Sequence, residues 1–149
     1  MTAREDREKE KIIAIARGVS PADMEKLADA LYKGGIRLLE ITFDQTKKNH
    51  LEETAESIRT VAGCYAGRMS VGAGTVMTKQ QVDAAYEAGA EFILSPNVNV
   101  EVIRYASGKG MVTIPGAMTP SEIVEAYEAG GDIIKVFPLS NLGASYIKN

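Results

Sequence analysis

Short apolar runs alternate with longer amphipathic segments along most of the chain. The runs are rich in β-branched and small residues and are bounded by glycine, proline or polar residues, which is typical of buried strands. Strands that alternate with helices predict a parallel sheet with right-handed helical crossovers. The predicted strands cover residues 12–16, 38–43, 70–76, 91–96, 111–116 and 132–138.

The segments between the strands predict helices with recognisable ends. Ser20-Pro21 gives an N-cap followed by proline at the first helical position, and Thr119-Pro120 repeats the pattern. Glycine follows most of these segments, as expected for helix C-termini. The predicted helices cover residues 20–34, 50–62, 78–89, 99–110 and 119–130, and the final residues resemble the start of a sixth.

The first ten residues form a charged segment that differs from the rest of the chain. They predict a solvated tail or a short surface helix. The remaining residues, 11–149, form the strand and helix alternation, and residues 78–96 align without a gap on residues 119–137. The offset of this internal repeat equals two strand–helix units, which supports the alternation and disfavours an all-helical solenoid.

Two architectures fit this order: a (β/α)8 barrel of the TIM type and an open doubly wound sheet. Small inward residues suit a barrel interior. Gly72 and Gly74 form a G-x-G, but the third glycine of a dinucleotide fingerprint is missing. We therefore predict an α/β fold of the (β/α)8 TIM-barrel type with about six units. Complete barrels need ~200 residues or more, so we expect this barrel to be incomplete.

Composition argues against several classes of function. The net charge of −3 and the lack of a long basic run argue against nucleic acid as a partner. The apolar runs are shorter than the ~18 residues of a membrane span, so we expect a soluble, cytoplasmic domain. Cys64 is the single cysteine and His50 the single histidine, and neither has ligand partners at metal spacing. We expect no metal and no cofactor.

Two ionisable residues fall on the inward side of predicted strands. In the strand at 132–138, alternation turns Ile133, Lys135 and Phe137 inward and leaves Ile134 and Val136 facing the helices. In the strand at 38–43, Leu38, Glu40 and Thr42 face inward. Thr75 ends the next strand. An acid and a lysine are thus expected in one interior, near the carboxyl ends where barrel active sites lie.

An inward lysine and glutamate have two interpretations. They can form a buried Glu40–Lys135 ion pair that only fills the barrel, although such pairs rarely add net stability. They can also act chemically: burial leaves part of an amine neutral, able to attack a carbonyl and form a Schiff base. A carboxylate can then move protons during dehydration and enamine formation. Together they suffice for a metal-free aldolase.

Five motifs give the chain a specific resemblance. In their order and spacing they resemble the 2-keto-3-deoxy-6-phosphogluconate (KDPG) / 4-hydroxy-2-oxoglutarate (KHG) aldolase family, from about Lys11 to the last residue. The motifs are LLEIT (38–42), VGAGTV (71–76), ILSP (93–96), IPGAMTPSEI (114–123) and IKVFP (134–138).

The resemblance implies a class I aldolase on a (β/α)8 barrel, usually trimeric, that forms pyruvate and an aldehyde. It makes Lys135 the Schiff-base lysine and Glu40 the general acid and base. Thr75 would contact the pyruvyl group, and Pro96 and Phe137 would line its pocket. The alternative for Pro96 and Phe137 is strand termination and core packing.

The chain departs from the family at two places. Many members carry an arginine shortly after the glutamate of the second strand, where this chain has Asp44. Arg17, at the end of the first strand, resembles an arginine that other members place there and could hold the substrate carboxylate. Its alternative is a solvent-exposed loop arginine. The family's glycine-rich loop and phosphate site have no match here.

Three functions therefore stay open. The first is an aldolase that cleaves KDPG or 4-hydroxy-2-oxoglutarate. The second is a catalytically inactive truncated or engineered barrel fragment that folds by self-association or by complementation. The third, a phosphate-binding barrel isomerase, has little support because the expected phosphate loops have no counterpart.

Overall fold

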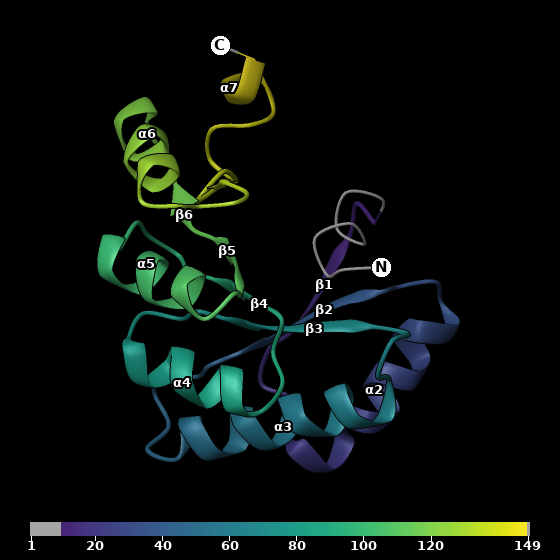
Figure 1. The fold of residues 1–149 in the computed structure, drawn as a ribbon. Coiled ribbons are helices and arrows are strands. Elements are labelled where there is room, and N and C mark those ends of the chain that lie inside the picture. Colours follow the sequence, from purple (N-terminus) through teal and green to yellow (C-terminus); the bar gives the residue numbers. More distant parts are fainter. Residues whose placement is uncertain (1–9, 149) are drawn as a thin grey trace.

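The computed structural model describes residues 10–148, so the charged segment at 1–10 lies outside the described residues except for Glu10. The predicted alternation of strands and helices is confirmed (Figure 1), but the predicted strand at 111–116 forms two short strands, β5 and β6, that belong to different sheets. The elements are β1 (Ile13–Ala16), α2 (Pro21–Lys33), β2 (Leu38–Thr42), α3 (His50–Cys64), β3 (Ser70–Gly74), α4 (Lys79–Glu87), β4 (Phe92–Leu94), α5 (Val100–Gly108), β5 (Val112–Ile114), β6 (Gly116–Ala117), α6 (Pro120–Glu128), β7 (Lys135–Val136) and α7 (Ser145–Lys148).

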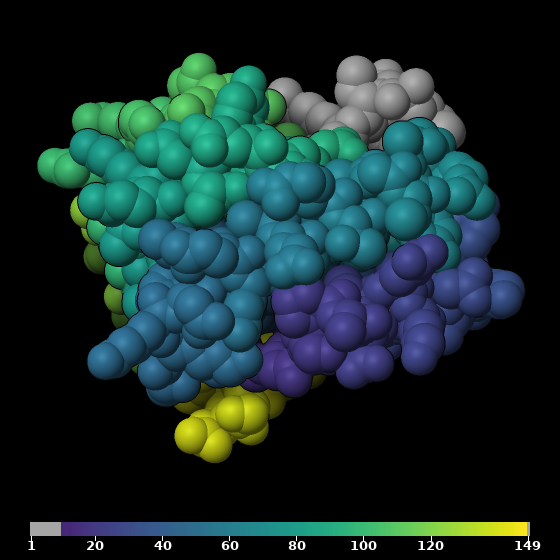
Figure 2. All heavy atoms as spheres, turned by 90° about the horizontal axis from the view of Figure 1, so that it is seen from below, coloured from purple at the N-terminus to yellow at the C-terminus, as the bar shows by residue number. Residues whose placement is uncertain are grey.

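The sheet distinguishes a barrel from a doubly wound fold. Strands β1 to β5 are all parallel and lie in chain order, and β6 pairs with β7 in a second parallel sheet. A doubly wound sheet would reverse its strand order at a switch point. Helices α2 to α6 lie side by side in the same order on the outside (Figure 2). The architecture is a partial α/β barrel of about six units.

Helices α4 and α6 begin in the same way, as the internal repeat predicts. Thr78 and Thr119 each accept a hydrogen bond from the third helical residue, which returns one to the cap backbone. These reciprocal bonds satisfy N–H groups that have no partner within the helix. The predicted cap of α2 is different: the Ser20 hydroxyl donates to Asp23 Oδ2 at 2.8 Å rather than accepting from the helix backbone.

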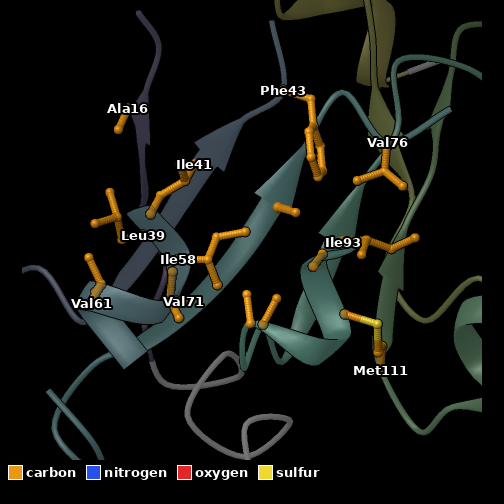
Figure 3. Close-up of a cluster of buried hydrophobic side chains, with 14 of the residues drawn as sticks. Ala16, Leu39, Ile41, Phe43, Ile58, Val61, Val71, Val76, Ile93 and Met111 are labelled. Carbon is orange, nitrogen blue, oxygen red and sulfur yellow. The ribbon is translucent and has the colours of Figure 1, made fainter. Parts of the chain in front are cut away.

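The main hydrophobic core lies between the sheet and the outer helices. Leu39, Ile41 and Val71 point from their strands toward Ile58 and Val61 of α3 (Figure 3). This arrangement confirms the predicted alternation in β2, because its odd-numbered residues pack on the helix layer. The even-numbered residues of β2 consequently face the barrel interior.

A smaller cluster fills the interior side of the sheet. Phe92, Leu94 and Ile114 are buried there and pack with Ile13 and Val112. A Cβ on Gly72 would lie 2.2 Å from Phe92 Cδ2, so the aromatic ring needs a glycine on the neighbouring strand. Since Gly72 pairs with Glu40 across β2 and β3, the apolar cluster adjoins the side of the sheet that carries the glutamate.

The predicted strand at 132–138 is wrong in extent, since only Lys135–Val136 forms a strand. The amides of Asp132 and Ile133 both donate to the carbonyl of Thr113, at 3.0 and 3.3 Å, and the Asp132 carboxylate accepts from Thr113 N. Two donors on one carbonyl do not continue a regular ladder. Pairing resumes where Lys135 N donates to Pro115 O at 2.9 Å.

The chain after β7 runs away from the sheet to α7 (Figure 1). The Tyr146 hydroxyl donates to the carbonyl of Met118, which ties α7 to the segment before α6. Within the described part of the chain, the helices are too short or too polar to span a membrane.

Candidate active site

Glu40 is a buried carboxyl group on the interior side of β2. It is 2% exposed, and its Oε1 accepts a hydrogen bond from the Thr42 hydroxyl at 3.3 Å. Oε2 is also buried and has no hydrogen-bond partner among the described residues. A buried carboxylate oxygen without a partner is costly, so this atom is available to a ligand or to a proton.

Gly74 makes room for that carboxyl group. A Cβ built on Gly74 would lie 1.7 Å from Glu40 Oε1 and 2.4 Å from the carboxyl carbon. The Glu40 side chain therefore lies directly against the backbone of β3. Sequence reasoning identified Gly74 only as part of a G-x-G, and the close approach that requires glycine depends on tertiary structure.

The environment of Glu40 favours retention of a proton. Burial raises the pKa of Glu40 above its ordinary value of 4.5. The positive charge of Lys135, the hydrogen bond from Thr42 and the charge of Arg17 oppose this rise only in part. A carboxyl group with a raised pKa holds its proton more readily than an exposed one, which suits general acid–base catalysis.

Lys135 faces the same interior from β7 but is half-buried, where the sequence predicted a buried lysine. The short, one-sided pairing of β7 explains this exposure. Its Nζ lies 4.5 Å from the centroid of the Phe137 ring. Lys135 and Glu40 do not form a salt bridge in the described part of the chain. The charge of Lys135 nevertheless acts on Glu40, so the two groups interact without a direct ion pair.

Thr75 has a backbone conformation that is unusual for its residue type. Its φ is 55°, and it is the one non-glycine residue with positive φ among residues 10–148. A β-branched residue there costs on the order of 1–3 kcal/mol, and such strain persists only when neighbouring contacts impose it. Phe43 N donates to Gly74 O and Val76 N donates to Leu94 O, both at 3.0 Å, so the flanking residues are fixed.

The other predicted site residues also follow the carboxyl ends of strands. Arg17 follows β1, is exposed, and is close enough for its charge to lower the pKa of Glu40. Pro96 follows β4 and is half-buried. Phe137 follows β7 and is 40% exposed. Its ring therefore lies beside Lys135 at an open surface rather than in a closed core.

Asp44 lies between β2 and α3, where the family resemblance suggested an arginine. Its Oδ1 accepts hydrogen bonds from the Thr46 hydroxyl at 2.6 Å and from Thr46 N at 3.0 Å. These bonds hold the pKa of Asp44 below its usual range. Asp44 thus carries a negative charge that is engaged within its own loop, and Arg17 is the cation near Glu40 on this side.

Gln45 and Gln81 lie beside Thr75 and were not predicted from the sequence. The Gln45 amide nitrogen donates to the carbonyl of Thr75 at 3.0 Å, and Gln81 Nε2 donates to Gln45 Oε1 at 2.9 Å. These residues are 36 positions apart in the chain, which is why no local pattern pointed to them.

Comparison with known proteins gives consistent matches. The family model described as KDPG and KHG aldolase matches residues 4–149. The 2-dehydro-3-deoxy-6-phosphogalactonate aldolase of Escherichia coli is 36% identical over 137 residues, which are 92% of this chain and 64% of that protein.

Solved structures agree in fold. One described as native KDPGal has a TM-score of 0.82 and 38% identity, and covers 91% of this chain and 63% of its own. The KDPG aldolase from Legionella pneumophila has a TM-score of 0.78 and 28% identity, with coverage of 91% and 63%. That protein was captured with pyruvate as a covalent carbinolamine intermediate.

The chain spans about six tenths of the length of these relatives. Within that span the similarity covers both β2, which carries Glu40, and β7, which carries Lys135. The chain belongs to the KDPG and KHG aldolase family.

Proposed function

We propose that the protein acts as a class I aldolase that cleaves a 2-keto-3-deoxy acid to pyruvate and an aldehyde. One observation carries this proposal: a half-buried lysine and a buried carboxyl group on two different strands lie near each other without an ion pair between them. Lys135 and Glu40 are close enough to interact electrostatically, yet they form no ion pair in the described structure. A substrate carbon can therefore bind between them.

The reaction starts with attack of the Lys135 amine on the C2 carbonyl of the substrate. The carbinolamine loses water, with Glu40 supplying the proton, and a protonated Schiff base forms. The Glu40 carboxylate then takes the proton of the C4 hydroxyl. The C3–C4 bond breaks, its electrons pass to the enamine, and the aldehyde leaves.

The second half returns the enzyme to its starting state. Protonated Glu40 gives its proton to C3 of the enamine, and the Schiff base forms again. Water adds at C2 and pyruvate leaves, which restores the free amine of Lys135. One water is released and one is consumed, so the net reaction is cleavage alone.

The surrounding residues provide binding rather than proton transfer. Arg17 is the cation placed to hold the substrate carboxylate, Thr75 contacts the pyruvyl group, and Pro96 and Phe137 line its methylene side. This assignment rests on the resemblance to the family, and the positions of these residues after β1, β3, β4 and β7 support it. A keto acid is the expected partner, and trimer formation is the expected assembly by similarity to the family.

The relatives suggest which substrates to test. The Escherichia coli protein is named for the phosphogalactonate substrate, and the Legionella protein is a KDPG aldolase. We propose KDPG, its galactonate epimer and 4-hydroxy-2-oxoglutarate as candidates. All three present the same 2-keto acid carbons to Lys135 and Glu40.

Reductive trapping tests the proposal. The protein is incubated with pyruvate and cyanoborohydride, a hydride donor that persists in acidic solution, and the modified peptide is identified by mass spectrometry. We expect a stable adduct at Lys135 and none in Lys135→Arg, while Lys79→Arg retains it because Lys79 is an exposed residue of α4. A folded protein without an adduct at Lys135 would disprove the assignment.

Exposed apolar residues favour a second candidate function, a non-catalytic barrel segment that folds by self-association or complementation. Ile15 of β1 and Ile133, which precedes β7, are 56% and 45% exposed. On α6, Ile123, Val124 and Tyr127 are exposed as well. Trapping and sedimentation together decide: a protein that traps pyruvate at Lys135 supports the aldolase, whereas an oligomer that does not trap pyruvate supports the second function.

A further inference from the structure

We propose that Gln45 is a positioning residue that holds Thr75 in its left-handed conformation and thereby sets the affinity of the site for the pyruvyl group. This inference rests on the proposed function, in which Thr75 contacts the bound keto acid. Gln45 belongs to the segment between β2 and α3, and Thr75 belongs to the segment between β3 and α4. One side-chain amide thus joins two loops at the mouth of the barrel.

The hydrogen bonds around Gln45 fix the orientation of its amide. The carbonyl of Thr75 can only accept, so the group 3.0 Å from it must be the Gln45 nitrogen. The Gln45 oxygen is then left to accept from Gln81 Nε2 at 2.9 Å. Neither amide can turn over without placing two acceptors or two donors against each other.

Gln81, in the first turn of α4, holds the Gln45 amide in place. It is 1% exposed, and its Oε1 accepts from Met77 N at 2.7 Å and from Thr78 N at 3.2 Å. Its oxygen is therefore fully used by the start of α4. Its nitrogen is directed to Gln45, so the rigid helix end supports the exposed glutamine that contacts Thr75.

The internal repeat shows that helix capping alone does not require this amide. Glu122 in α6 corresponds to Gln81, and its carboxylate accepts from Met118 N at 2.8 Å and Thr119 N at 3.0 Å. A carboxylate thus provides the same cap. The nitrogen that distinguishes Gln81 from Glu122 is the atom that reaches Gln45.

The peptide group between Thr75 and Val76 is held at both of its polar atoms. Val76 N donates to Leu94 O, and Thr75 O accepts from Gln45, both at 3.0 Å. If the bond from Gln45 is lost, one backbone hydrogen bond alone opposes rotation of this peptide group toward a relaxed conformation. Such a rotation would move the hydroxyl of Thr75 from the position in which it meets the keto acid.

Gln45→Glu tests the proposal because the change keeps the side-chain shape. At neutral pH the carboxylate places an oxygen against the Thr75 carbonyl, and we expect the pyruvate concentration for half-maximal trapping at Lys135 to rise roughly tenfold. Below the usual glutamate pKa of about 4.3 the protonated acid can donate to Thr75 O and accept from Gln81. The ratio of mutant to wild-type half-saturation should therefore fall toward one as the pH falls.

The control is Gln80→Glu, which adds the same charge on an exposed neighbouring residue of α4. It should trap pyruvate like wild type at every pH. A Gln45→Glu half-saturation within about twofold of wild type, with no dependence on pH, would overturn the proposal. Wild type without an adduct would instead reject the proposed function.

Amide hydrogen exchange needs no ligand, so it tests the positioning role of Gln45 independently of the proposed function. Gln45→Glu should speed exchange of the Val76 amide at neutral pH relative to wild type and Gln80→Glu. Unchanged exchange at Val76 would reject the positioning role, whatever the trapping result.

Discussion

The carboxylate of Glu40 occupies the space in which a side chain on Gly74 would begin, with Oε1 only 1.7 Å from the position of a Cβ. The position of the Glu40 side chain thus depends on β3, against which it packs, as well as on β2, to which it belongs. The proton-transfer group and the backbone of β3 form one packed unit.

Gly74→Ala should displace Glu40. Overpacking of this kind costs typically 1–3 kcal/mol of unfolding free energy, and the shifted carboxyl group should slow adduct formation at Lys135 more than it changes half-saturation. Urea denaturation and the time course of trapping measure both effects. Gly108→Ala is the control, because nothing lies within 4 Å of its Cβ position and it ends a helix. Equal behaviour of the two variants would contradict the packed arrangement.

Glu40→Gln should change the pH dependence of stability. The folded-state pKa of Glu40 is raised, so the folded protein binds its proton more tightly than the unfolded chain does. The stabilising contribution of the protonated group is complete below the ordinary value of 4.5 and is lost as the pH rises through the folded pKa. Wild type should therefore lose stability relative to Glu40→Gln between acidic and neutral pH. Parallel denaturation curves across this range would show that burial does not control the group.

Thr75→Gly should stabilise the fold while it weakens pyruvate binding. Glycine adopts positive φ without the steric penalty of a β-branched residue, which is worth about 1–2 kcal/mol before the entropy of glycine reduces the gain. Thr75→Ala keeps most of the backbone strain and loses the hydroxyl, so it separates the two effects. Thermal melts and half-saturation of trapping give the comparison. A less stable Thr75→Gly variant would mean that the conformation is not strained.

Val124→Lys should reduce self-association if the outer face of α6 is an interface. Val124 is exposed next to Ile123 and Tyr127, and a charge there would be costly to bury against another chain. Sedimentation velocity at several concentrations measures the change. Glu125→Lys, on a neighbouring exposed position, serves as the control for added positive charge. An identical distribution of species for wild type and Val124→Lys would exclude this face.

The parts of the fold that depend on local pattern were predictable. The alternation of residues 38–43 predicted that Glu40 faces inward. This prediction held because β2 pairs with a neighbouring strand on each side, which keeps it regular. The caps at Thr78 and Thr119 were also visible in the sequence, since a capping box lies within four residues.

The parts that depend on tertiary contacts were not predictable. The strand predicted at 132–138 was too long. The apolar pattern does not show that the amides of Asp132 and Ile133 both donate to Thr113 O, which interrupts the strand. The positive φ of Thr75 and its contact with Gln45 depend on segments 30 residues apart. The sequence predicted the side of the strand on which Lys135 lies, but it did not predict that Lys135 is only half-buried. That exposure follows from the pairing of β7 on one side alone.

The internal repeat gives the molecule two similar helices, α4 and α6, in different structural environments. Val82 of α4 is 0% exposed, whereas Ile123 at the matching position of α6 is 37% exposed, although both helices share the same capping box. Helix α4 lies between two neighbours, and α6 has its helical contact with α5. The chain thus contains two helices that share a capping box and differ in their neighbours, and the helix with neighbours on both sides has the more deeply buried residue at the matching position.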